Sequence, residues 1–115
     1  MDINMRFGDL LKELIKKEGI TQQKFYESVG IGKPYFYDIA SGKVCPPPPD
    51  VQMRMVSAFT KLTPDEKTGF FDVAARERKE VPADIAKMLF DHPGDMNSVR
   101  KVLQALLVTR SIRLN

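Results

Sequence analysis

The sequence has very few of the residues that form covalent cross-links and metal sites. Its 115 residues include one cysteine, Cys45, and one histidine, His92. A single cysteine excludes an internal disulfide, and one cysteine with one histidine cannot form a Cys/His metal cluster. No basic segment followed by an apolar core opens the chain, so we expect no signal peptide. No uninterrupted apolar run approaches the length of a membrane span, and we expect a cytoplasmic protein without membrane association.

The composition is that of a soluble globular domain. Hydrophobic residues make up 43% of the chain, which is enough to bury a core and too much for a disordered chain. The net charge is +3, which permits a nucleic-acid partner without requiring one. Residues 1–50 contain seven basic and seven acidic side chains, whereas residues 97–115 contain four basic side chains and no acidic one. The basic surplus therefore lies near the C-terminus.

Apolar residues recur with helical spacing along the whole chain. The residues Phe7, Leu10, Leu11, Leu14 and Ile15, for example, follow the i, i+3, i+4, i+7 pattern of one helix face. No segment shows sustained alternation with a period of two, so we predict an all-α fold. The expected helices lie, roughly, at 5–18, 22–29, 33–40, 51–59, 64–78, 82–91 and 97–112.

The stretch VGIGKPYFYDI, residues 29–39, contains two glycines and a proline within six residues. Gly30 can adopt the positive φ that ends a helix, and Pro34 is tolerated only in the first turn of the next one. One continuous helix is excluded, because Pro34 would clash inside it. We therefore predict a corner between two short helices. The run Pro46–Pro49 that follows is interpreted as a stiff connector, with a ligand for an SH3-like groove as the alternative.

Two short helices joined by a glycine-containing turn form a helix-turn-helix. Such a unit can present its second helix to the major groove of DNA. Gln22 begins the first of these helices, where its amide can reach a phosphate. The second helix is expected to bury Phe36, Ile39 and Ala40. Its aromatic run, residues 35–37, is interpreted as one core side chain, one half-buried neighbour and one exposed tyrosine. The same geometry also occurs outside DNA-binding proteins, so spacing alone leaves the function open.

The sequence pattern over residues 7–62 resembles the phage repressor/Cro-like (XRE-type) helix-turn-helix family. The resemblance rests on the motifs Gly19-Ile20-Thr21-Gln22, Val29-Gly30-Ile31 and Ile39-Ala40-Ser41-Gly42-Lys43. The segment FFDVAARERKEVPADIAKMLFDHP, residues 70–93, is similar to the C-terminal extension of some XRE-type regulators of Gram-positive bacteria and their mobile elements.

The resemblance implies a five-helix DNA-binding domain that usually acts as a dimer on a two-fold operator. Such a transcriptional regulator would repress a promoter by blocking polymerase, and activation is equally compatible with the sequence. Residues in the first turn of the recognition helix would contact base edges. The loop after this helix would lie near the DNA backbone. We also expect lysines to supply the basic face of the helix-turn-helix. The DNA-binding residues expected in this way are Gln22, Lys24, Lys33, Pro34, Tyr37, Asp38, Ser41 and Lys43.

Several residues depart from the family pattern. A tyrosine, Tyr26, stands where the family has a small residue, so it needs extra room or must point outward. Ala40 replaces a frequent glutamate, and Pro34 replaces a side chain that can hydrogen-bond. With the neutral first half of the chain, these departures support an alternative function: a protein-interaction module on a helix-turn-helix scaffold that binds another regulator or a toxin.

The expected organisation is a helix-turn-helix domain over residues 1–62 and a helical extension over residues 63–115. The apolar side of the last helix could close the core or form a homodimer, and we favour dimerisation. The residues expected at this interface are Val99, Val102, Leu103 and Leu106. The sequence lacks a catalytic Ser/His/Asp set and a phosphate-binding glycine loop, so we expect neither an enzyme nor a cofactor, and we infer no small-molecule ligand.

Overall fold

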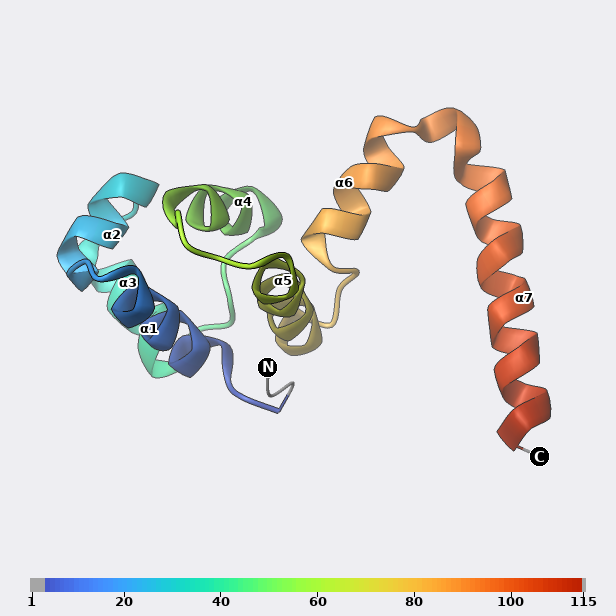
Figure 1. The fold of residues 1–115 in the computed structure, drawn as a ribbon, viewed down its shortest axis with the longest axis horizontal. Coiled ribbons are helices and arrows are strands. Elements are labelled where there is room, and N and C mark those ends of the chain that lie inside the picture. Colours follow the sequence, from blue (N-terminus) through green and yellow to red (C-terminus); the bar gives the residue numbers. More distant parts are fainter. Residues whose placement is uncertain (1–3, 115) are drawn as a thin grey trace. The chain divides into compact units, whose positions relative to one another are not determined.

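The computed structural model describes the backbone of residues 4–114 and the side chains of residues 4–108. Within that part every regular element is helical, which confirms the all-α prediction (Figure 1). The chain divides into two compact units, Met1–Asp84 and Ile85–Asn115. The elements are α1 (Phe7–Glu18), α2 (Gln22–Val29), α3 (Lys33–Ser41), α4 (Pro49–Ala58), α5 (Pro64–Arg78), α6 (Ala83–Asp91), the short 3₁₀ helix η1 (Pro93–Asp95) and α7 (Met96–Leu114).

Helix α1 is the central element of the first unit. It packs against α2, α3 and α5, while α2 also contacts α3 and α4. In Figure 1, α1 crosses in front of α3. The apolar stripe predicted for α1 is buried along its whole length. Burial of each large apolar side chain contributes about 1.5–3 kcal/mol, so this stripe is a main source of the unit's stability.

Aromatic side chains join the helix-turn-helix to the rest of the core. Phe25 of α2 stacks on Phe59, with ring centroids 4.9 Å apart, and lies 6.2 Å from Phe36 of α3. Phe7 of α1 packs against Phe70 of α5 at 5.1 Å. Such aromatic pairs add about 0.5–1.5 kcal/mol to the burial of their area. The positions of α2 and α3 are therefore fixed by side chains far away in sequence.

The first compact unit extends past the domain boundary expected at residue 62. Helix α5 belongs to it, because Phe70, Val73 and Ala74 are buried in the same core as α1. Polar contacts add to this packing: Arg76 of α5 donates a 2.8 Å hydrogen bond to the carbonyl oxygen of Met5. The separate compact unit, Ile85–Asn115, thus covers only the later part of the helical extension expected over residues 63–115.

Helices α1 and α3 approach most closely at Gly8. A Cβ atom added there would lie 2.3 Å from the carbonyl oxygen of Ala40 and 2.8 Å from that of Ile39. Both of these atoms belong to the backbone, which cannot rotate away as a side chain can. Glycine is therefore required at position 8 for the two helices to cross at this distance, and Ala40 is buried there.

The proline-rich connector lies against the first unit. Pro46 and Pro47 are buried, and their carbonyl oxygens accept 2.8 Å hydrogen bonds from Arg78 and Gln52, respectively. These contacts support the interpretation as a connector. Helix α4 begins slightly before the expected residue 51: its N-cap is Pro48, and Asp50 lies within the first turn.

Glu18 joins the end of α1 to the loop between α4 and α5. Its carboxylate is buried and accepts hydrogen bonds from the backbone N–H of Thr60, from the Thr60 hydroxyl at 2.8 Å and from the backbone N–H of Lys61 at 3.2 Å. The backbone N–H of Thr60, followed by the Thr60 hydroxyl, lowers the pKa of Glu18 below its ordinary value. These bonds favour the ionised carboxylate, so folding favours it as well.

We expect the free energy of unfolding of Glu18→Gln to depend less on pH at acid pH than that of wild type. A carboxyl group with a lowered pKa in the folded state stabilises the protein above its unfolded pKa and loses that contribution as the pH falls through the folded pKa. The variant should be less stable than wild type at about pH 7 and should lose less stability between about pH 5 and pH 3. Urea unfolding at a series of pH values measures this.

Glu13→Gln is the matched control for this experiment, because it removes an exposed carboxylate from the same helix. The acid-side slope of this control should equal that of wild type. Equal slopes for Glu18→Gln and Glu13→Gln would contradict the role given to the Glu18 carboxylate.

Candidate nucleic-acid interface

The corner between α2 and α3 is formed as the sequence predicts. Gly30 has a φ of 83°, and its N–H donates to the carbonyl oxygens of Tyr26 and Glu27 at 3.0 and 3.2 Å. Ile31 packs against the core, and Gly32 begins α3 with extended backbone. Pro34 lies in the first turn of α3. The corner is therefore a fixed connection with one residue anchored in the core.

The residues expected to bind DNA all reach the surface of the first unit. Lys24, Lys33, Pro34, Tyr37, Ser41 and Lys43 are exposed, and Gln22 and Asp38 are partly exposed. The inward side of α3 is as predicted, because Phe36 and Ile39 are buried. Helix α3 thus has one face in the core and one available to a partner.

Lys33 and Tyr37 lie close together on α3. They are four residues apart, and Lys33 Nζ is 6.0 Å from the centre of the Tyr37 ring. Tyr37 is 46% exposed, and its ring meets Phe36 edge-on at 5.4 Å. A buried aromatic thus supports an exposed one, which limits the orientations that Tyr37 can take. Together they offer a cation and a phenol at the front and middle of α3.

Asp38, Ser41 and Lys43 form a second group at the end of α3. Lys43 Nζ lies 4.0 Å from Asp38 Oδ1, and the Ser41 hydroxyl donates a 3.2 Å hydrogen bond to the Asp38 carbonyl oxygen. Lys43 partly balances the acidic charge that would otherwise repel phosphates. Gln22 and Lys24 on α2 make no side-chain hydrogen bond or ion pair with this group among the residues described.

Core packing accounts for two of the departures from the family pattern. Tyr26 is 8% exposed and packs against Phe36, with ring centroids 5.5 Å apart, so it points inward and the core provides its room. Ala40 is buried, and its carbonyl group lies at the close crossing with Gly8. Both residues thus belong to the packed core of the first unit.

Two arginines near the helix-turn-helix were not singled out by the sequence. Arg54 of α4 donates a 3.0 Å hydrogen bond to the carbonyl oxygen of Val29, at the end of α2. Arg6 lies next to Gly42, directly after α3. Both contacts join segments that are distant in sequence, and no local pattern predicts them. Basic residues outside the motif therefore contribute to the surroundings of α2 and α3.

The chain matches no protein-family model, no curated protein and no solved structure. Among the residues described, no three His, Cys, Asp or Glu side chains come together in a group that could hold a metal ion. None of the described helices combines the length and the apolar character that a membrane span requires.

Proposed function

We propose that this chain is a sequence-specific double-stranded DNA-binding transcriptional regulator of the repressor-like helix-turn-helix type, which acts as a dimer. One observation carries the proposal: the rigid corner fixes α3 with Phe36 and Ile39 buried and with Lys33 and Tyr37 exposed on a neighbouring face of the helix. In such a unit the second helix enters the major groove. The five helices α1–α5, which share one core, would form the DNA-binding domain.

Each exposed group on α3 has a chemistry suited to DNA. Lys33 can donate to guanine or to a phosphate, and Asp38 can accept from the amino group of cytosine. Tyr37 can contact a base edge or a phosphate through its hydroxyl. Pro34 orders the first turn and offers an apolar contact. Bound at a promoter, the dimer would repress transcription by blocking polymerase.

The apolar side of α7 is the proposed dimer interface. Val102, Leu103 and Leu106 are each more than half exposed, and Val99 is partly buried. Leu107 and Val108 are also exposed. A helix with so many exposed large apolar side chains is typical of an interaction surface. A dimer would place two copies of α3 in successive major grooves, about 34 Å apart.

Selection from a random-sequence duplex pool tests the proposal. Wild type should enrich an inverted repeat over several rounds. A Lys33→Ala/Tyr37→Ala variant should enrich nothing, because both proposed contacts of α3 are removed. Both side chains are exposed, so the variant should keep wild-type helicity by circular dichroism.

A Tyr35→Ala/Lys67→Ala variant is the matched control. It also removes an exposed tyrosine and an exposed lysine, but Tyr35 lies about 200° around α3 from Tyr37 and Lys67 is on α5. It should enrich the same repeat as wild type. If neither wild type nor the control enriches any sequence, the proposal is wrong, and the helix-turn-helix is a scaffold for another regulator or a toxin.

A further inference from the structure

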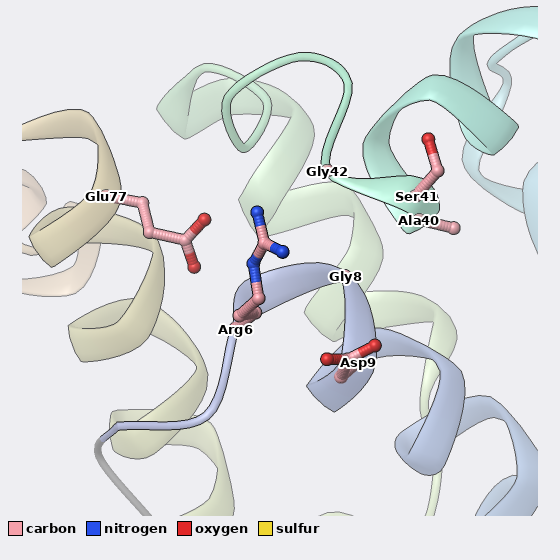
Figure 2. A pocket seen from close by; sticks show the side chains of 7 residues that line it. All are labelled: Arg6, Gly8, Asp9, Ala40, Ser41, Gly42 and Glu77. Carbon is pink, nitrogen blue, oxygen red and sulfur yellow. The ribbon is translucent and has the colours of Figure 1, made fainter.

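The side chain of Arg6 points toward the end of α3. A Cβ atom built on Gly42 would lie 3.2 Å from Nη2 and 3.6 Å from Cζ of Arg6. Figure 2 shows the guanidinium rising from the start of α1 between Glu77 of α5 and Gly42. These residues line a polar hollow of about 30 Å³, which has room for about one water molecule. Arg6 is thus a cation beside the loop that follows α3.

Among the residues described, the two carboxylates that line this hollow with Arg6 have other partners. Glu77 accepts a hydrogen bond from the backbone N–H of Phe7, and Asp9 lies 3.4 Å from Lys12. The Arg6 guanidinium has five N–H donors but makes no hydrogen bond or ion pair with any residue that the structure describes. Its charge is therefore available to a ligand from outside.

The backbone on both sides of Arg6 is held by α5. Arg76 donates to the carbonyl oxygen of Met5 at 2.8 Å, and Glu77 accepts from the N–H of Phe7. Two adjacent residues of α5 thus fix the two neighbours of Arg6, about seventy positions away in sequence. Because its backbone is fixed, Arg6 can present its guanidinium at a defined place beside Gly42.

We propose that Arg6 binds a phosphate of the DNA backbone next to the C-terminal end of α3, beside Lys43. The inference rests on the function proposed above and adds a contact to it. Helix α3 has nine residues and is about 13 Å long, close to the width of the major groove, about 12 Å. Cations would then lie near the phosphates at both edges of the groove. Lys33 would lie at one edge, and Arg6 and Lys43 at the other. A phosphate contact of this kind fixes register and carries no sequence information.

Binding to the selected duplex and to a scrambled duplex, measured over a series of salt concentrations, tests this. Arg6→Ala should weaken binding to both duplexes by a similar factor, about three- to tenfold, and should reduce the slope of log K against log salt by about 0.9. Arg6→Lys should restore most of the slope, because it retains the charge. Lys67→Ala removes an equal charge from an exposed site on α5 and should leave the slope unchanged.

Thermal unfolding of the same variants separates phosphate binding from a purely structural role at Gly42. A lowered melting temperature for Arg6→Ala with an unchanged salt slope would overturn the inference, and so would wild-type affinity and slope. In both cases wild type still binds the selected duplex, so the proposed function stands. Failure of wild type to bind any duplex would overturn both.

Discussion

A Gly8→Ala variant is expected to lose about 3 kcal/mol or more of its free energy of unfolding, a large part of the 5–15 kcal/mol typical of a domain. Helix propensity alone predicts the opposite sign, since alanine is favoured over glycine by about 1 kcal/mol inside a helix. The crossing with α3 decides the outcome. The new Cβ would lie 2.3 Å from the Ala40 carbonyl oxygen and 2.8 Å from the Ala40 carbonyl carbon.

Backbone atoms can relieve this clash only if α1 and α3 move apart. That movement would open the packing around Phe7, Leu11 and Ile39, which are almost completely buried. The resulting voids would lower the free energy of unfolding further, because each methylene that is no longer buried costs about 0.8 kcal/mol of stability. We therefore expect Gly8→Ala to unfold at a much lower urea concentration than wild type. Far-UV circular dichroism during a urea titration measures this midpoint.

Gly94→Ala is the matched control for Gly8→Ala. A Cβ at Gly94 would meet no atom within 4 Å, and the residue does not have a positive φ. The control should unfold at the wild-type midpoint. If Gly8→Ala instead matched or exceeded the wild-type midpoint, the close crossing of α1 and α3 would be wrong.

Features that depend on neighbouring residues could be predicted from the sequence. Thr63 and Glu66, three residues apart, form a capping box at the start of α5, where a helix was expected from residue 64, and Gly30 ends α2 with the expected positive φ. The environments of the three aromatics of α3 were also anticipated: Phe36 is buried, while Tyr35 and Tyr37 are 37% and 46% exposed. Each of these results follows from helix periodicity or from the stereochemistry of a turn.

Features that depend on contacts between distant segments could not be predicted. Periodicity shows that Tyr26 shares a face with the core side of α2, but only the position of Phe36 shows that there is room for it. Likewise, nothing near Gly8 in sequence indicates Ala40 as its neighbour. The packing of α5 against α1, past the boundary expected at residue 62, has no local signature either.

The sequence indicated that the proposed DNA-binding residues lie on the surface. It did not indicate which of them lie close to one another. Asp38 is one of the seven acidic residues counted over residues 1–50, whereas in the structure Lys43 Nζ lies 4.0 Å from its carboxylate. Arg6 was only one of seven basic residues in a neutral half of the chain. Its position beside Gly42 depends on α5, which holds the residues on either side of it. Net charge therefore says little about the local charge around α3.

A Leu103→Gln/Leu106→Gln variant is expected to be monomeric and to bind the operator about 100-fold or more weakly than wild type, because the two DNA-binding units are no longer linked. Both leucines are more than half exposed in the single chain, so their replacement should not reduce its helicity. Analytical ultracentrifugation measures the assembly, and titration of duplexes with one or two half-sites measures binding. The variant should bind both duplexes alike, whereas wild type should prefer two half-sites.

Val44→Gln/Val81→Gln is the control for the loss of exposed apolar surface. These valines are 38% and 56% exposed and lie in loops of the first compact unit. The control should sediment as wild type and keep the preference for two half-sites. Should wild type itself sediment as a single chain at concentrations that saturate the operator, α7 is not a dimer interface. A dimer that persisted in the leucine variant would place the interface elsewhere, because charge-free glutamine amides cannot replace the packing of two leucines.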